Sequence, residues 1–316
     1  MSSELERVEL LRRALAGSPP RVTLGIGDDA AVIVPPAEPL VWTVDAAVEG
    51  VHFRRDLLAL DDLGYRATMA AASDLAAMGA APLGLLAALV LPPWVSDADL
   101  AALAAGQREA AEALGTAVIG GNLARGTELS ITTTALGFAA RPLTRAGARP
   151  GDALWMAGPV GLAAAGLAAL ERSGALPGAV AIAVAAWRRP RARIAEGQRA
   201  GTTARAAIDV SDGLARDVGH LARASGVRAV LEAAAIVGDE LRSAAAALGR
   251  DPLALALHGG EDYALVVTLP PGEVLAGFVR IGAVEPASGG APVVLRAADG
   301  AVRAVGEDGF DHFLGA

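Results

Sequence analysis

Apolar and polar positions in the first half of the chain follow helical patterns in some stretches and extended patterns in others. Amphipathic spacing predicts helices over residues 3–16 and 96–115, and Ser96 is placed to cap the second of them. A third helix is predicted over 61–79, because this stretch opens on two aspartates and stops at a glycine. Apolar or alternating runs predict strands at 39–46, 83–92, 116–122 and 128–139.

The second half of the chain alternates more regularly between short apolar runs and helical patterns. Residues 141–158, rich in Pro, Gly and Arg, separate the halves and predict two domains, 1–142 and 143–316. Alternation of this kind is typical of α/β (α+β) architecture. Strands are predicted at 153–157, 206–210, 228–232, 263–269 and 278–284, and helices at 161–172, 190–199, 213–225 and 239–248.

Composition limits the class of protein. The 316 residues suffice for one large domain or two ordinary ones, and 53% of them are hydrophobic, with a mean hydropathy of +0.43. The apolar excess is mostly Ala, Val and Leu, and we expect no membrane helix, which needs roughly 20 predominantly apolar residues. The charged N-terminal stretch lacks the apolar core of a secretory signal. We therefore expect a cytoplasmic protein with no membrane partner.

Two residue types are missing from the sequence. There is no cysteine, which excludes disulfides, thiolate metal sites and a cysteine nucleophile. There is no lysine, so all 27 basic residues are arginines, which excludes a Walker-type phosphate lysine and Schiff-base chemistry. The net charge of −8, without a long basic cluster, argues against a nucleic-acid partner.

Acidic residues occur where a charge is unfavourable unless it is neutralised. The stretch GIGDDAAVI places two adjacent carboxylates before residues 30–34, which the pattern predicts to be a strand entering a core. Another acid lies inside a helix that is apolar on almost every face. Oxygen ligands without a His or Cys cluster indicate a hard cation such as Mg²⁺, and hence a phosphate-bearing substrate. The acids are Asp28, Asp29, Asp45, Asp74, Asp209, Asp212, Glu261 and Asp262.

Each acid alone also has a structural explanation. Asp28 fits a side chain that closes a turn, Asp45 fits a turn at the end of a strand, and Asp212 fits a helix cap. Asp74 fits such a role least, because an aspartate in the middle of an apolar helix caps nothing. The joint pattern, rather than any one residue, therefore indicates a site.

Other candidates have weaker support. Glycine pairs before Asn122 and Glu261 would let backbone N–H groups approach phosphate oxygens, whereas GIGDDA is no dinucleotide fingerprint because a strand is predicted after it. His52 fits either a substrate contact or a packed loop residue, and Arg145 fits either a phosphate clamp or a surface linker. Phe310 fits either a stacking platform or a terminal core residue.

Seven motifs occur in an order typical of one enzyme family. GIGDDAAV, VDAAVEGVHF, SDLAAMGAAP, LTRAGARPGD, AIDVSDGLARDVGHL, HGGEDYAL and GFDHF, within residues 24–313, resemble the motifs of the thiamine-monophosphate kinase family, in the superfamily of aminoimidazole ribonucleotide synthetase. The resemblance implies the two-domain fold of that superfamily, with an N-terminal domain that forms a β-barrel across a homodimer. It also implies ATP-dependent phosphorylation of thiamine monophosphate to thiamine diphosphate by direct in-line transfer, with several Mg²⁺ ions.

The resemblance further implies roles for individual residues. Transfer to a phosphate acceptor that is already anionic needs no general base, so no catalytic side chain is expected and catalysis depends on alignment and charge neutralisation. The implied metal ligands are Asp29, Thr43, Val44 (through its carbonyl), Asp45, Asp74, Asn122, Asp209 and Asp212. The implied ATP contacts are Gly121, Asn122, Arg145 and Ser211, and the implied thiamine contacts are His52, Glu261 and Phe310.

Three positions depart from the family pattern. Val44 has no side-chain oxygen where a hydroxyl is usual, Asn122 replaces a metal-binding aspartate, and Phe310 replaces Trp or Tyr. An amide oxygen coordinates without charge, so one magnesium is expected to bind more weakly. Two alternatives stay open: another ATP-dependent enzyme of the superfamily, and a catalytically weakened protein that binds thiamine phosphate or nucleotide. The selenophosphate and hydrogenase-maturation branches are disfavoured by the missing cysteine and lysine.

Overall fold

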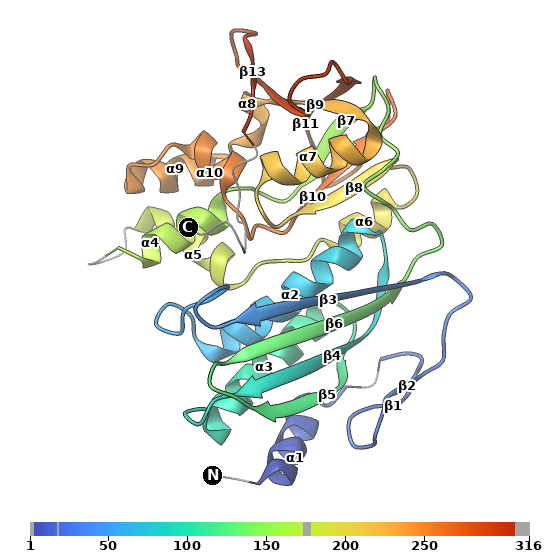
Figure 1. Ribbon diagram of the computed structural model, residues 1–316, viewed down its shortest axis with the longest axis vertical. Helices are drawn as coiled ribbons and strands as arrows, with labels where there is room; N and C mark the ends of the chain where they lie inside the picture. Colours follow the sequence, from blue (N-terminus) through green and yellow to red (C-terminus); the bar gives the residue numbers. More distant parts are fainter. Residues whose placement is uncertain (1–2, 18, 173–177, 307–316) are drawn as a thin grey trace. The chain divides into compact units, whose positions relative to one another are not determined.

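The computed structural model describes residues 3–17, 19–172 and 178–306 (Figure 1). Contacts divide the chain into two units, the first formed by Met1–Leu75 with Ala80–Ala140 and the second by Ala76–Gly79 with Arg141–Ala316. The sequence predicts a boundary between residues 142 and 143. Each unit contains its own sheet and its own helices.

A four-stranded sheet forms the centre of the first unit. Its strand order is β3-β6-β4-β5, and pairing is antiparallel except between β4 and β5, which run parallel. The strands are β3 (Leu40–Val48), β4 (Ala81–Leu91), β5 (Val118–Arg125) and β6 (Ser130–Phe138). Because β3 and β5 are edges, the sheet is open, and the described part of the chain contains no closed barrel.

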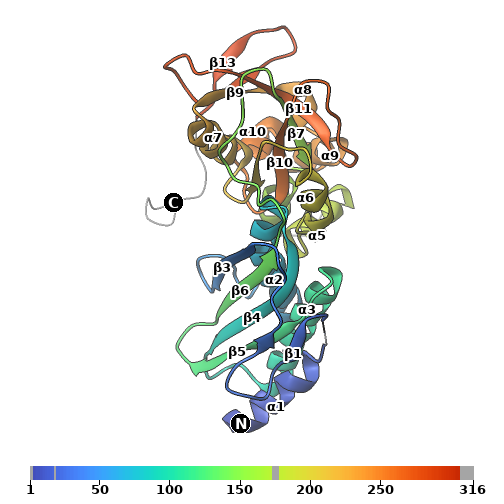
Figure 2. The same cartoon turned by 90° about the vertical axis from the view of Figure 1, so that its right-hand side faces the viewer.

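Helices cover only one face of this sheet (Figures 1 and 2). Leu85 points towards them and is fully buried, whereas Trp42 and Leu86 point to the opposite, exposed face, as strand alternation requires. The third helix begins at a capping box in which Ser96 and Asp99 exchange hydrogen bonds, as the sequence predicts for Ser96. The helices are α1 (Glu4–Ala14), α2 (Leu60–Ala77) and α3 (Asp97–Ala113).

A seven-stranded sheet forms the second unit, in the order β13-β12-β9-β11-β7-β10-β8. Among these strands only β12 and β9 pair in parallel, so the fold is a mixed α/β fold rather than a doubly wound parallel one. Leu154, Ile208 and Val266 of the sheet belong to one apolar core with the helices. The strands are β7 (Ala153–Ala157), β8 (Ala206–Val210), β9 (Val227–Glu232), β10 (Ala264–Leu269), β11 (Val279–Pro286), β12 (Val293–Arg296) and β13 (Val302–Ala304). The helices are α4 (Leu162–Leu170), α5 (Ala181–Arg188), α6 (Ile194–Ala200), α7 (Leu214–Ser225), α8 (Ala233–Ile236), α9 (Asp239–Leu248) and α10 (Pro252–His258).

Two predictions near the acids are wrong. The pattern predicts a strand entering a core at 30–34, but β2 (Val32–Ile33) has two residues and pairs with β1 (Val22–Leu24) in a small separate sheet. So short a ladder buries little, and Val32 stays exposed. Asp45 is predicted at the end of a strand, yet β3 continues to Val48 and Asp45 lies in its interior.

The remaining elements of the second unit agree with the predicted pattern in some places and differ from it in others. The strands predicted at 153–157 and 206–210 are confirmed as β7 and β8, and the helix predicted at 190–199 begins only at Ile194. The pattern misses α5, α10, β12 and β13, which are too short for clear periodicity. Among the described residues, none of the helices combines the length and the apolar character needed to cross a bilayer.

Candidate functional site

The inner face of the first sheet and the helix α2 that packs on it together carry three of the predicted metal ligands. Thr43 and Asp45 are two residues apart in β3, so their side chains share a face. The Thr43 hydroxyl donates a hydrogen bond to the Asp74 carboxylate on α2. Thr133 pairs directly with Asp45, and its buried hydroxyl has no hydrogen-bond partner among the described residues. This face therefore presents carboxylate and hydroxyl oxygens from two strands and one helix.

The adjacent aspartates lie over the other face of the same sheet. Asp28, Asp29 and Asn122 line a groove of about 890 Å³ there. The Asp29 N–H donates to the Asp28 carboxylate at 2.8 Å, so Asp28 shapes the turn. The Val44 side chain also points to this face and is 61% exposed. The sheet thus separates Asn122 and the Val44 side chain from the Thr43 hydroxyl, which points the opposite way.

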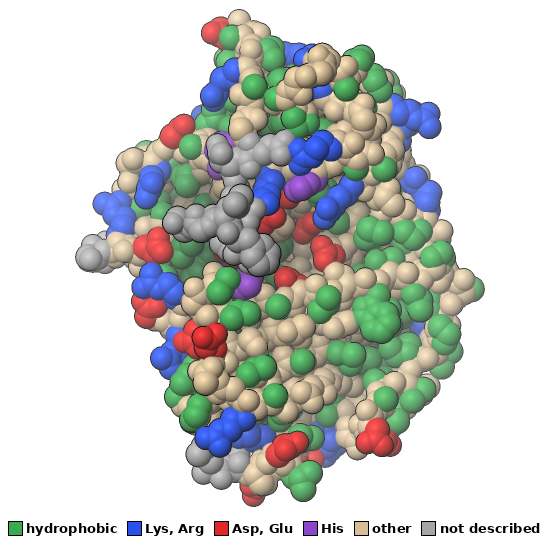
Figure 3. All heavy atoms as spheres, in the orientation of Figure 1, with side chains coloured by type: hydrophobic (Ala, Val, Ile, Leu, Met, Phe, Trp, Pro, Cys, Tyr) green, Lys and Arg blue, Asp and Glu red, His purple; other side chains and the backbone are tan. Residues whose placement is uncertain are grey.

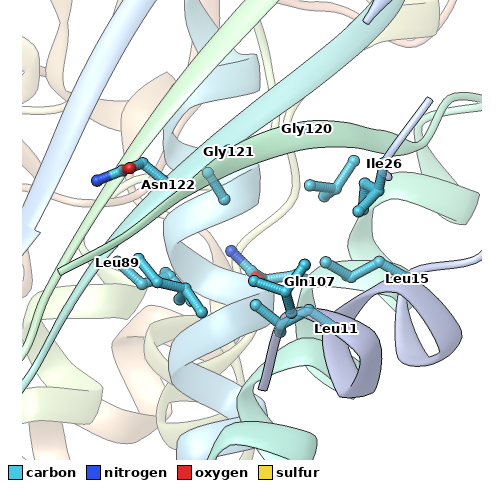
Figure 4. A pocket seen from close by; sticks show the side chains of 12 residues that line it. Leu11, Leu15, Ile26, Leu89, Gln107, Gly120, Gly121 and Asn122 are labelled. Carbon is cyan, nitrogen blue, oxygen red and sulfur yellow. The ribbon is translucent and has the colours of Figure 1, made fainter. Parts of the chain in front are cut away.

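A smaller pocket lies beneath the sheet, between β5, α1 and α3 (Figure 4). Gly121 lines both this pocket and the groove, and a Cβ there would lie 1.9 Å from the Ala87 carbonyl oxygen. The Gln107 amide is fully buried at the pocket wall, without a hydrogen-bond partner among the described residues. Only glycine fits at position 121, so the backbone of this predicted ATP contact stays uncovered by a side chain.

In the second unit, three predicted site residues follow the strand β8. Asp209 is buried near its end, and Ser211 and Asp212 form the turn into α7. The N–H groups of Ser211 and Asp212 both donate to one carboxylate oxygen of Asp217, at 3.0 Å each. The N-cap residue is Gly213 and no side chain caps α7 among the described residues, so Asp212 is not the cap; Asp217 binds the N–H groups of the turn that precedes the helix.

The pKa of Asp217 is shifted by burial and by the other carboxylates of this turn. Burial, together with the nearby Asp209 and Asp212 carboxylates, raises the pKa of Asp217 to about 7, although its two backbone hydrogen bonds lower it. Asp217 is not among the site residues expected from the sequence, where its signal is a third acid in the motif AIDVSDGLARDV. Negative charge is therefore crowded here, and a bound cation would favour the ionised carboxylates.

The turn formed by residues 259–262 is joined to the same end of the sheet. The Glu261 N–H donates to the Ser211 carbonyl at 2.7 Å. A Cβ at Gly260 would lie 2.5 Å from that carbonyl oxygen, so only glycine lets the two turns meet. Glu261 has a left-handed φ of 65°, which is uncommon outside glycine. The residues brought together at this end of the sheet are Asp209, Ser211, Asp212 and Glu261.

Asp262, next to Glu261, has a different role. Its carboxylate accepts the N–H groups of Gly161 at 2.6 Å and of Ala163 at 3.0 Å, at the start of α4. A carboxylate is stabilised there because the first N–H groups of a helix lack partners within the helix. Asp262 therefore anchors α4 to the turn, and Glu261 is the candidate for contact with a ligand.

The remaining predicted residues are His52, Arg145 and Phe310. The His52 ring nitrogen Nδ1 accepts the Val48 N–H at 3.1 Å, at the end of β3. Arg145 is exposed, and its carbonyl accepts the Ser225 hydroxyl at 3.0 Å. Phe310 lies outside the described residues.

A dedicated metal cage is not present in the described part of the chain, where no three Asp, Glu or His side chains converge on one point. Magnesium needs fewer, because one or two carboxylates usually hold it while water and phosphate oxygens fill the other positions. The Thr133 hydroxyl, which has no hydrogen-bond partner within the described part of the chain, and the crowded carboxylates around Asp217 are oxygen ligands of the hard type that Mg²⁺ prefers. Two oxygen sets therefore fit Mg²⁺: Thr43, Asp45 and Asp74 in the first unit, and Asp209 and Asp212 in the second.

Curated relatives match most of the chain. Residues 27–139 match the family model described as AIR synthase related protein, N-terminal domain. Thiamine-monophosphate kinase of Mycobacterium tuberculosis H37Rv is 37% identical over 286 residues, which are 84% of this chain and 80% of the relative. The same-named protein of Escherichia coli K12 is 39% identical over 259 residues, which are 79% of this chain and 77% of the relative.

Solved structures agree with these relatives. AaThiL complexed with AMPPCP and TMP has a TM-score of 0.81 at 31% identity, covering 98% of this chain and 97% of that one. Thiamine-monophosphate kinase from Stenotrophomonas maltophilia K279a has a TM-score of 0.80 at 33% identity, covering 94% and 95%. Escherichia coli HypE, a hydrogenase maturation protein, shares the fold at 19% identity, with a TM-score of 0.75 and 99% of each chain covered. With this mixed α/β fold and these relatives, the chain belongs to the thiamine-monophosphate kinase family.

Proposed function

We propose that this chain transfers the γ-phosphoryl group of ATP to the phosphate of thiamine monophosphate, giving thiamine diphosphate and ADP. A phosphate oxygen of the acceptor forms the new P–O bond while the bond from the γ-phosphorus to the bridging oxygen of ADP breaks, in line. The acceptor oxygen is already anionic, so no side chain has to remove a proton. The observation that carries the proposal is the junction of the 211–213 and 259–262 turns in a chain 37% identical to a thiamine-monophosphate kinase.

The metal ligands belong to this proposal. Bound Mg²⁺ would neutralise and align phosphate oxygens, which is the main requirement of phosphoryl transfer. The Thr43–Asp74 hydrogen bond and the crowded acids near Asp217 support the two oxygen sets described above. We propose as further ligands Asp29, the Val44 carbonyl and Asn122.

The substrate contacts are also proposed. Gly121, Asn122, Arg145 and Ser211 would contact ATP, and the uncovered backbone at Gly121 supports the first of these. His52, Glu261 and Phe310 would contact thiamine monophosphate. For Glu261 the support is its left-handed backbone in a turn that two neighbouring segments hold in place. Because ATP is the co-substrate, we place the reaction in the cytoplasm.

We further propose that two copies of the chain pair through the uncovered face of the four-stranded sheet. Leu40, Trp42 and Val44 on this face are 52%, 70% and 61% exposed. Hydrophobic side chains gather over the strands in Figure 3. Several large apolar side chains exposed on one face of a sheet are a feature of interaction surfaces. Two such sheets facing each other would form the family's dimeric barrel.

The activity is tested with the purified chain, ATP, Mg²⁺ and thiamine monophosphate, with thiamine diphosphate quantified by chromatography. We expect product only when all three additions are present, and none when unphosphorylated thiamine replaces the monophosphate. A folded protein that forms no thiamine diphosphate contradicts the proposal.

A binding protein without turnover is the second candidate, because Asn122 carries no charge where the family has an aspartate. Calorimetric binding of thiamine monophosphate without product would indicate it. In that case Asn122→Asp is expected to restore measurable turnover, since it returns a charged metal ligand.

A further inference from the structure

Trp187 lies on α5, outside every segment assigned to the site so far. Its side chain is 2% exposed, and its indole N–H donates a hydrogen bond to the Glu261 carboxylate at 3.2 Å. An indole N–H can only donate, and a carboxylate is the stronger kind of acceptor for it. The contact therefore joins a buried, rigid donor to the side chain of a proposed substrate residue.

Trp187 and Glu261 are also linked indirectly, through packing between α5, α4 and the turn that contains Glu261. The helices α4 and α5 approach closely, because a Cβ at Gly166 of α4 would lie 2.1 Å from the Ala183 carbonyl oxygen of α5. The start of α4 is held by the Asp262 carboxylate, and Asp262 directly follows Glu261. The backbone of the turn and the carboxylate of Glu261 are thus both fixed relative to α5.

Fixing the carboxylate matters because a glutamate has three side-chain torsions. Ordering a free glutamate at the moment of binding costs side-chain conformational entropy. A glutamate already held by a buried donor has lost most of that freedom before the ligand arrives. The oxygen that does not accept the indole N–H then points in a fixed direction.

We propose that Trp187 is a positioning residue for thiamine monophosphate: its indole N–H holds the Glu261 carboxylate in the rotamer that accepts hydrogen bonds from the amino-substituted ring of the substrate. This inference rests on the proposed function, because it takes Glu261 as a substrate contact. Trp187 itself touches no reacting atom, so removing its N–H weakens the affinity for thiamine monophosphate and leaves the affinity for ATP unchanged.

The test uses two changes at Trp187 and one at Glu261. The Kd of each protein is measured by calorimetric titration with thiamine monophosphate and, separately, with ATP. Trp187→Phe removes the N–H together with some volume. Replacing Trp187 by β-(3-benzothienyl)alanine puts sulfur in place of the N–H and keeps the two-ring shape, so that packing is preserved. Glu261→Ala provides the background in which Trp187→Phe has no carboxylate to act through.

We expect both changes at Trp187 to raise the Kd for thiamine monophosphate roughly tenfold, the size expected for a hydrogen bond to a charged group. We expect no change in the Kd for ATP, and no further loss when Trp187→Phe is added to Glu261→Ala. Wild-type affinity in the benzothienyl protein overturns the inference, as does an equal loss with and without Glu261. A wild-type chain that does not bind thiamine monophosphate overturns the proposed function and this inference with it.

Discussion

Asp74 occupies the interior of α2, where a carboxylate has no capping role, and the Thr43 hydroxyl donates to it. The sequence alone singles out Asp74 for this reason, and the structure adds a partner from a strand. A charge kept at such a position is unfavourable in an apolar helix unless something neutralises it. The residue therefore gives a direct test of the proposed metal site.

Asp74→Asn keeps the shape of the side chain and an oxygen that can accept the Thr43 hydrogen bond, but removes the charge. We expect kcat for thiamine diphosphate formation to fall by about two to three orders of magnitude, as for loss of a group that stabilises transferred charge. Thermal unfolding should stay within a few degrees of wild type. The matched control is Asp239→Asn, at a fully exposed carboxylate, which should keep full activity. Wild-type kcat in a folded Asp74→Asn protein contradicts the assignment.

Asp217 makes stability depend on pH. Its pKa in the folded chain is about 7, whereas an unfolded aspartate titrates near 3.9, so the unfolded chain loses this proton first as pH rises. The group therefore lowers the free energy of unfolding progressively between about pH 4 and pH 7, by roughly 1.4 kcal/mol per unit of pKa difference. Asp217→Asn should flatten this dependence in urea unfolding of the metal-free protein. Parallel pH profiles of the two proteins over that window would falsify the expectation.

The residue types of the site could be predicted from the sequence, but their surroundings could not. Unusual acids such as Asp74 and Glu261 are visible because Asp74 lies in the mostly apolar stretch MAAASDLAAM and Glu261 follows a glycine pair. Trp187 and Gln107 are not visible, because a buried Trp or a helix Gln is ordinary until its distant partner, or the lack of one, is known. Partners 74 residues apart, as for Trp187 and Glu261, leave no local pattern.

At the scale of elements, the two turns that follow β8 and precede β10 behave as one unit. The Glu261 N–H and the Ser211 carbonyl join them, and antiparallel pairing of the strands brings them to the same end of the sheet. This arrangement depends on the absence of a side chain at Gly260. The consequence is testable with a single methyl group.

Gly260→Ala places a Cβ 2.5 Å from the Ser211 carbonyl oxygen, so one of the turns has to move. We expect a loss of about 1–3 kcal/mol in the free energy of unfolding, as for other overpacked sites, and at least tenfold lower kcat/KM for thiamine monophosphate. Gly290→Ala is the matched control, because no described heavy atom would lie within 4 Å of its Cβ. Equal stability and activity of the two variants would contradict the prediction, because close contact of the two turns would then not be required.

Elements with long, clear periodicity could be predicted, and short ones could not. The helix α2 has eighteen residues of consistent character, whereas β2 has two and gains its strand geometry only from β1. The apolar run at 30–34 resembles a buried strand because hydrophobicity alone does not distinguish a core strand from an exposed one. At Asp45 the pattern ends a strand too early, because a charged residue need not end an edge strand. The strand β3 continues for three residues after Asp45.

At the scale of the whole molecule, the uncovered face of the four-stranded sheet leads to a prediction about the association of two chains. Trp42→Asp places a charge at a side chain that is 70% exposed in the single chain. If two copies pair there, the charge would be desolvated, and we expect dissociation to monomers by light scattering at micromolar concentration. Val274→Asp is the control, at a 73% exposed valine of the second unit. A wild-type monomer, or a dimeric Trp42→Asp protein, contradicts pairing through this face.

The α/β class of the chain could be predicted from its alternating pattern, but the order of its strands could not. Pairing such as β9 with both β11 and β12 joins segments that are far apart in sequence. Only one neighbouring pair in the second sheet is parallel, although strand–helix alternation is also typical of parallel sheets. Which strands meet is decided by burial over the whole unit, and this information is absent from any short window.

Trp42 also has an optical consequence. The chain has four tryptophans, and in the single chain Trp42 is largely in contact with solvent while Trp187 is enclosed. An indole in water emits at longer wavelength than one in apolar surroundings. Pairing of the sheets would move the Trp42 emission towards the blue, and dilution would reverse that shift. The association of two copies can therefore be followed by intrinsic fluorescence, without any label attached to a chain that has neither a thiol nor a lysine amine.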